Sequence, residues 1–230
     1  MDVESVFSLV KVPSQSPLTI WRWSVKNDRK VLNLIKQYHP QGGLDKAAIL
    51  VLNLLGIGHY LVRQHAERVA LLAREVARQL KWDDKAVFFA GIFHDIGKLT
   101  VAPHLFDGRE ITAEEYAHVK QHAIAGFRAL RDLYLMTALC AGLHHAMYQK
   151  GYGLTIADFP KGLSLRTIKK ILEISTLVAI CDDIDATLSR KTSLKDGTQA
   201  GLSLEGRLAQ KFPDDTNIVR LALEVARAKQ

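Results

Sequence analysis

The most informative part of the sequence is the segment Ala86-Val-Phe-Phe-Ala-Gly-Ile-Phe-His-Asp-Ile-Gly-Lys98. Its first eight residues are apolar or glycine on all sides, which is typical of a helix at the centre of a fold. His94 and Asp95 follow directly, and both groups are costly to bury without partners. Lys98 lies four residues after His94 and three after Asp95, so the three side chains can meet at one end of the helix. Taken alone, the segment fits a helix-capping Asp–Lys pair as well as it fits a functional site.

Helical spacing of apolar residues continues on both sides of this segment, and no convincing two-residue alternation indicates a strand. Helices are predicted at residues 28–38, 45–55, 59–80, 83–96, 112–131, 133–148, 164–189 and 215–228. The helix at 112–131 is expected to begin with a capping box formed by Thr112 and Glu115. The fold class that follows is all-α.

The chain of 230 residues shows no internal repeat. We predict one main domain over residues 46–230, preceded by an N-terminal arm and first helix over residues 1–45. Residues 1–25 are expected to form an irregular arm whose Trp21 and Trp23 pack onto the body of the protein.

The composition is that of a soluble globular protein, because 48% of residues are hydrophobic and 24% are charged. These values exclude a disordered or collagen-like chain. The net charge of +7 favours an anionic partner, but the basic residues lack interleaved aromatic residues, which argues against sequence-specific nucleic-acid binding. Two cysteines cannot build a disulfide framework, so a cytoplasmic location is expected. No secretory signal is apparent, and the longest apolar stretch, residues 47–62, is interrupted, so no membrane association is expected.

Further potential ligands lie at or near the ends of other apolar segments: His65, His122, His144, His145, Asp182 and Asp185. Each has an ordinary explanation alone, such as a hydrogen-bonded core histidine for His65 or a solvated helix end for the aspartates. Together they would require several coincidences. Imidazole and carboxylate groups from several helices suit Fe, Mn, Zn or Ni. A bridging aspartate can hold two ions about 3.5–4 Å apart, an arrangement that hydrolyses phosphate esters.

The order of these residues resembles the HD superfamily of metal-dependent phosphohydrolases, and within it the HD-GYP branch, the cyclic di-GMP phosphodiesterases. The segment Phe93-His-Asp-Ile-Gly-Lys-Leu99 is similar to the core motif of that branch. The segment from Ile111 to His122 is similar to its next helix. The resemblance covers residues 58–225 and implies an HD-domain helical bundle with a dinuclear metal centre between helices.

Two further segments carry the resemblance towards the C-terminus. His144-His145 and Gly151-Tyr152-Gly153 stand where the branch has a double histidine and a Gly-Tyr-Pro loop, and residues 177–188 resemble its last ligand helix. Three positions depart from the pattern. Ala146 replaces a glutamate, Gly153 replaces the proline with about one residue missing before Gly151, and Leu61 replaces the glutamate of members that bind a third metal. We therefore expect an altered Gly-Tyr-Pro loop and two ions rather than three.

The resemblance also implies the site residues. One ion would be held by His65, His94, Asp95 and Asp182, and the second by Asp95 as a bridge, His122, His144 and His145. Lys98 would steady the attacking hydroxide or a phosphate oxygen, with a helix-end salt bridge as the alternative. Arg190 or Lys191 stands near a phosphate-contacting arginine of the branch, where a solvated charge run fits equally well. The ions would be divalent transition metals, Fe or Mn in the first place, with Zn, Ni or Mg as alternatives.

The function implied is a metal-dependent phosphohydrolase, a phosphodiesterase that hydrolyses cyclic di-GMP or a related nucleotide by a hydroxide that two metals activate. The partner would be a small phosphate ester or a cyclic dinucleotide, and a homodimer is left open. One alternative is a non-catalytic nucleotide-binding sensor or adaptor that keeps the metal site. Another is an HD phosphohydrolase that acts on a different phosphorylated metabolite.

Overall fold

The computed structural model describes residues 17–106, 109–149, 151–189 and 202–228, and every regular element within these ranges is helical. The prediction of an all-α fold is confirmed. The α-helices are α2 (Pro17–Tyr38), α3 (Leu44–Gly58), α4 (Tyr60–Gln79), α5 (Asp84–Phe93), α6 (Ala113–Lys120), α7 (His122–Leu130), α8 (Leu135–Leu143), α9 (Leu165–Ser189), α10 (Leu204–Lys211) and α11 (Thr216–Arg227). Short 3-10 helices are η1 (Ile96–Thr100), η2 (Pro103–Phe106), η3 (Ile156–Asp158) and η4 (Pro213–Asp215).

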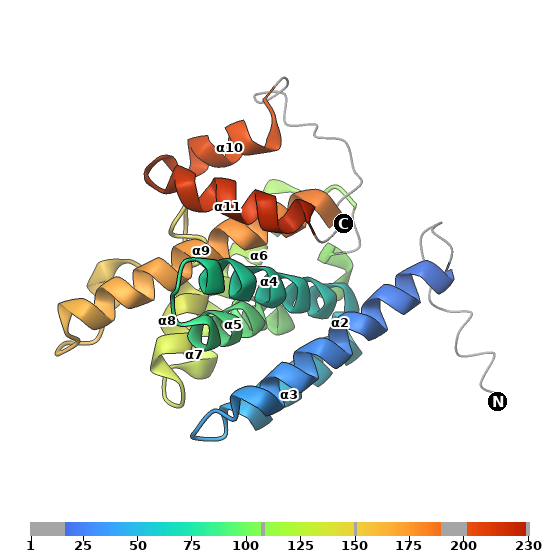
Figure 1. Ribbon diagram of the computed structural model, residues 1–230, viewed down its shortest axis with the longest axis horizontal. Helices are drawn as coiled ribbons and strands as arrows, with labels where there is room; N and C mark the ends of the chain where they lie inside the picture. The colour runs from blue at the N-terminus through green and yellow to red at the C-terminus, as the bar shows by residue number, and fades with distance from the viewer. Residues whose placement is uncertain (1–16, 107–108, 150, 190–201, 229–230) are drawn as a thin grey trace.

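Helix α5 lies at the centre of the bundle (Figure 1). All its residues from Val87 to Phe93 are buried. Val87 and Ala90 belong to a core cluster with α4, α8, α9 and α11, whereas Phe88 and Phe89 belong to a second cluster with α2 and α3. Helix α5 is therefore apolar all round because it fills two cores at once.

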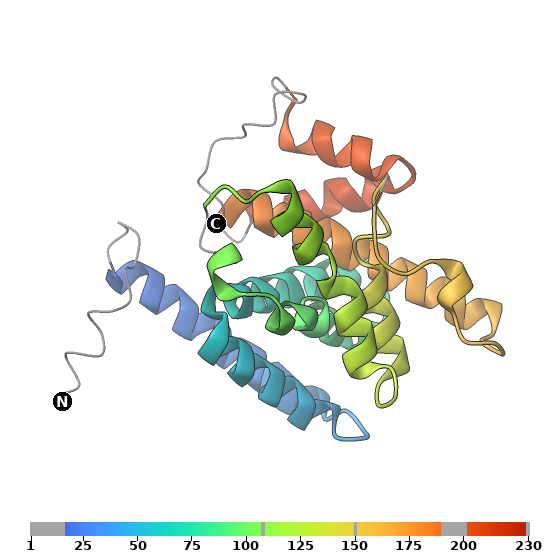
Figure 2. The ribbon, with the colours of Figure 1, turned by 180° about the vertical axis from the view of Figure 1, so that it is seen from behind.

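Helices α2 and α3 form an antiparallel pair at one edge of the molecule, and α6, α7 and α8 lie in front of α4 and α5 in the reverse view (Figure 2). Helix α2 begins at Pro17, so the expectation of an irregular arm was wrong for residues 17–25. Proline suits the first turn of a helix because its φ is already helical and its missing N–H would have no partner there. The side chains of Trp21 and Trp23 lie outside the described part of the chain.

Three predicted helices end or break earlier than their apolar patterns suggest. The helix from 83 stops at Phe93 and gives way to η1, and the helix from 133 stops at Leu143. The predicted helix 112–131 divides at Gln121 into α6 and α7, although its capping box of Thr112 and Glu115 is confirmed. Helix α10, capped by Ser203, was not predicted.

Gly97 allows the segment after α5 to pack closely against α7. A Cβ atom at residue 97 would lie 1.9 Å from the carbonyl oxygen of His122 and 2.7 Å from the amide nitrogen of Gly126. Helix η1 can therefore pack against α7 only because residue 97 has no side chain. This close packing brings the His94-Asp95 turn next to His122.

None of the helices in the described ranges combines the length and the apolar composition needed to span a bilayer.

Candidate metal centre

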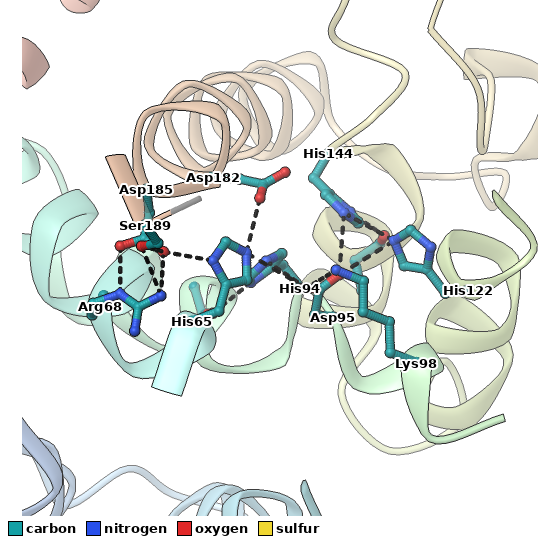
Figure 3. Close-up of polar contacts among 12 residues, drawn as sticks. His65, Arg68, His94, Asp95, Lys98, His122, His144, Asp182, Asp185 and Ser189 are labelled. Carbon is teal, nitrogen blue, oxygen red and sulfur yellow. Dashed lines mark hydrogen bonds and ion pairs between the residues drawn. The ribbon is translucent and has the colours of Figure 1, made fainter. Parts of the chain in front are cut away.

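The structure brings together all seven predicted metal ligands from five α-helices and the turns that follow them. Figure 3 labels six of the seven, all except His145. His65 lies in α4, Asp182 lies in α9, and His122 begins α7. The remaining ligands follow helix ends: His94 and Asp95 after α5, and His144 and His145 after α8. The early helix ends noted above therefore turn these four side chains inward.

The two carboxylate oxygens of Asp95 face two different groups of histidines. Asp95 Oδ2 lies 3.3 Å from His94 Nε2 and 3.6 Å from His65 Nε2. Asp95 Oδ1 lies 3.3 Å from His122 Nε2 and 3.9 Å from His144 Nε2. A buried carboxylate in this position can serve two cations, one on each oxygen.

Backbone carbonyls fix the orientation of three histidines. His94 Nδ1 donates to Gly91 O, His122 Nδ1 to Val119 O and His144 Nδ1 to Ala141 O, each at 2.7 Å. Because a carbonyl can only accept, Nδ1 carries the proton and Nε2 presents a lone pair. Each histidine uses the carbonyl three residues before it, which is exposed where a helix ends.

The lone pairs at the centre could bind a cation. His122 Nε2 and His144 Nε2 are 3.4 Å apart, and neither has a proton to share. Two nitrogens bound to one tetrahedral ion at about 2.1 Å would be separated by roughly 3.4 Å. Among the described residues, the buried atoms His94 Nε2 and Asp95 Oδ1 have no hydrogen-bond partner, which is unusual for buried polar atoms. The donor set and these atoms fit bound metal ions.

His65 differs from these three histidines, because side chains and not a backbone carbonyl hold its ring. Its Nε2 lies 2.9 Å from Asp182 Oδ1, and its Nδ1 lies 2.7 Å from Asp185 Oδ2. Arg68 donates to both oxygens of Asp185, at 2.6 and 2.8 Å, and to Ser189 Oγ (Figure 3). A carboxylate on the far nitrogen is a common means of orienting a ligand histidine and raising its basicity.

The sequence indicated Asp185 as a potential ligand, three residues after Asp182 on one helix face, but it gave this carboxylate no role and did not indicate Arg68. No spacing in the sequence points to Arg68, because it meets Asp185 across 117 residues of chain.

The charges of the site suit divalent cations. Burial lowers the pKa of His122, of His144 and of His145, the last to about 3, so these imidazoles are neutral. Burial would raise the pKa of Asp95, but Lys98 and His94 hold it well below its usual value. Burial is likewise outweighed at Asp182, where the hydrogen bond from His65 lowers the pKa of the carboxyl group. Two ionised carboxylates thus lie beside three neutral imidazoles, those of His122, His144 and His145.

Lys98 lies beside the centre with its ammonium group paired to Asp95, which is the salt bridge that the sequence offered as the alternative to a role towards hydroxide or phosphate. Burial lowers the pKa of His65, but the hydrogen bonds that the ring donates to Asp182 and Asp185 outweigh burial and raise the pKa to about 9. The same carboxylates that retain a proton on His65 would attract a metal ion, which replaces that proton when it binds. Arg190 and Lys191, predicted near the phosphate, lie outside the described residues.

The glycine-rich loop after α8 packs against the end of that helix. A Cβ atom at Gly151 would lie 1.9 Å from His145 O, and Gly153, at a φ of 123°, approaches Gly142 O in the same way. The Tyr152 ring stacks on the His145 ring with centroids 4.6 Å apart. Tyr148 Oη donates to Asp182 Oδ2 at 3.2 Å. The loop therefore holds both a histidine and a carboxylate of the candidate centre.

Comparisons with known proteins agree with this geometry. The HD domain family matches residues 62–188. The cyclic di-GMP phosphodiesterase of Thermotoga maritima is 34% identical over 137 residues, which cover 56% of this chain and 34% of that protein. The 3'3'-cGAMP-specific phosphodiesterase 1 of Vibrio cholerae is 28% identical over 145 residues, covering 60% of this chain and 32% of that protein. The chain thus spans about a third of the length of these relatives.

A solved structure shares the fold. The HD domain of the phosphodiesterase PgpH of L. monocytogenes superimposes with a TM-score of 0.52 at 15% sequence identity, covering 78% of this chain and 99% of that chain. At this identity the similarity supports the helical architecture alone.

Proposed function

The chain belongs to the HD domain family, and we propose that it is a metal-dependent phosphodiesterase with a dinuclear centre. The observation that carries the proposal is Asp95, whose two oxygens face separate histidine groups. HD domains are metal-dependent, and the His/Asp clusters could hold metal ions.

In the proposed centre, His65, His94, Asp95 and Asp182 hold one ion, and Asp95, His122, His144 and His145 hold the other. Two bound divalent ions supply Lewis acidity, which activates water for attack on phosphorus and neutralises charge on the phosphate oxygens. The preferred ions are two Fe or two Mn. Zn, Ni and Mg can also bind this set of nitrogen and oxygen donors, with different affinities.

The chain's own residues contribute position and charge. The three carbonyl-bound histidines are already oriented before substrate arrives, which is the usual requirement of an efficient site. Lys98 Nζ lies beside Asp95. From there it can donate a hydrogen bond to a phosphate oxygen of a substrate bound at the centre. Tyr148 holds Asp182, and burial raises the pKa of Tyr148 well above its usual value, so this phenol stays protonated and remains a donor.

The proposed substrate is cyclic di-GMP or a related cyclic dinucleotide. Support comes from the names of the Thermotoga and Vibrio relatives and from the motifs that resemble the HD-GYP branch, here with an altered Gly-Tyr-Pro loop. We further propose that the HD domain covers residues 46–230 and that a substrate phosphate reaches Arg190 or Lys191. The protein is proposed to be cytoplasmic and to form a homodimer, which size-exclusion chromatography would detect.

Hydrolysis by the metal-reconstituted protein tests the function. We expect turnover of a cyclic dinucleotide by the wild type and at least a hundredfold loss in Asp95→Asn, with full activity in Asp183→Asn. Asp183 is a matched control because it lies on α9 but pairs with Lys211 instead of a site histidine. Turnover of only linear nucleotides or sugar phosphates would overturn the cyclic dinucleotide and favour the broader HD phosphohydrolase.

One observation favours a second function. Ala146 and Gly153 alter the loop that follows the double histidine, which is where the resemblance to active phosphodiesterases is weakest. Nucleotide binding that survives Asp95→Ala, together with undetectable turnover by the wild type, would identify a sensor or adaptor that keeps its metal site.

A further inference from the structure

Tyr152 connects the candidate metal centre to the surface beside it. Its ring stacks on His145 at 4.6 Å with an interplanar angle of 29°, and its centroid lies 6.3 Å from that of His122. Tyr152 therefore lies directly against two of the predicted ligands.

Helix α6 brings a lysine between two tyrosines at this position. Lys120 Nζ lies 4.7 Å from the Tyr116 ring centroid and 5.5 Å from the Tyr152 ring centroid. Within the described ranges, no carboxylate lies at ion-pair distance from Lys120. Tyr116 is 47% exposed, so part of its ring is open to a ligand. The helix that carries Lys120 leads directly into His122, which lies beside Asp95 in Figure 3.

We propose that Tyr116, Lys120 and Tyr152 form a nucleotide-binding subsite, in which the base stacks on Tyr116 and Lys120 contacts a phosphate. The proposal rests on the proposed phosphodiesterase function for the position of the reacting phosphate. Such a subsite would favour a nucleotide, whose phosphate ester carries an aromatic base, over a sugar phosphate. Aromatic side chains beside a cation bind the flat face of any base together with its phosphate charge. Of the two features, only the lysine would help to hold inorganic phosphate.

The alternative is that the lysine only stabilises α6 through its two rings, as exposed cation–π pairs do weakly. The two explanations differ in what they predict for ligands. A structural role would affect guanosine monophosphate and ribose 5-phosphate alike, whereas a base-stacking role would affect only the ligand that has a base.

Calorimetric titration of the metal-loaded protein separates them. We expect Tyr116→Leu to weaken guanosine monophosphate binding by about 5- to 150-fold, the range found for loss of one stacked base, and to leave ribose 5-phosphate binding unchanged. Tyr116→Phe keeps the ring and should bind like the wild type. Lys120→Gln should weaken both ligands about tenfold. Lys169→Gln is the control, since Lys169 is an exposed lysine of α9 paired with Glu173.

The subsite is overturned if the wild type binds both ligands equally, if it binds neither, or if Tyr116→Leu affects both to the same extent. Because binding is measured without turnover, the result is independent of the enzymatic assay. If Tyr116→Leu selectively loses guanosine monophosphate binding and the wild type hydrolyses no substrate, the result would support the subsite and contradict the phosphodiesterase function. Hydrolysis of a cyclic dinucleotide with unchanged KM in Tyr116→Leu and Lys120→Gln would contradict the subsite alone.

Discussion

Replacing Asp185 with asparagine should weaken one metal position and spare the other. In the structure, Asp185 Oδ2 lies 2.7 Å from His65 Nδ1, and Arg68 holds the same carboxylate in a bidentate pair. His65 is the one histidine of the proposed set for which a side chain, and not a backbone carbonyl, is seen to hold Nδ1. Its orientation therefore depends on a group that a mutation can remove.

The magnitude follows from that contact. A hydrogen bond to a charged group contributes about 1.5–3 kcal/mol, which corresponds to roughly a 10- to 150-fold change in a dissociation constant. Loss of a carboxylate that orients a ligand histidine usually costs about 10- to 100-fold in metal affinity. We therefore expect the dissociation constant of the ion on His65 to rise by about 10- to 100-fold, and that of the ion on His122 to stay within about twofold.

The assay is a titration of the metal-free protein with Mn²⁺, in which free Mn²⁺ is followed by its electron paramagnetic resonance signal. The wild type should fill two positions, and Asp185→Asn should fill one with unchanged affinity and one weakly. Asp183→Asn, whose carboxylate pairs with Lys211, should match the wild type. Two unchanged dissociation constants in a folded Asp185→Asn protein would refute the reasoning, and so would equal weakening of both.

Three other predictions concern packing, pH and metal removal. Gly97→Ala should lower the free energy of unfolding by about 3 kcal/mol, because the new Cβ meets His122 O at 1.9 Å. Gly58→Ala, with no atom within 4 Å, should leave thermal unfolding unchanged. Metal binding should tighten by up to tenfold per pH unit from pH 7 to about 9. The pKa of His65 is raised to about 9, so a proton competes with the ion for this histidine below that pH. A dissociation constant that does not change with pH would exclude His65 as a ligand. Removal of metal by a chelator should lower Tm by about 5–10 °C, and an unchanged Tm would contradict a resident centre.

Local patterns were enough to predict the central helix and to single out most residues of the candidate centre. The segment 86–98 combines unbroken apolar character with an abrupt His-Asp pair, and burial on two sides of α5 explains the apolar character. The capping box at Thr112 is a contact between neighbouring residues, so a short sequence pattern specifies it completely.

Contacts between distant residues could not be predicted in the same way. The close packing of η1 against α7 at Gly97 is a contact between distant segments, which periodicity does not describe. The Arg68–Asp185 pair joins α4 and α9 across 117 residues. Which oxygen of Asp95 faces which histidine is likewise set by the packing of several helices, so only the family resemblance assigned the bridge to Asp95.

The central claim is a pair of metal ions joined by Asp95, and anomalous diffraction from crystals of the metal-reconstituted protein tests it most directly. We predict two peaks about 3.5–4 Å apart, one within about 2.3 Å of His65 Nε2 and His94 Nε2 and the other equally close to His122 Nε2 and His144 Nε2, with Asp95 between them. A single peak, or peaks remote from Asp95, would contradict the account.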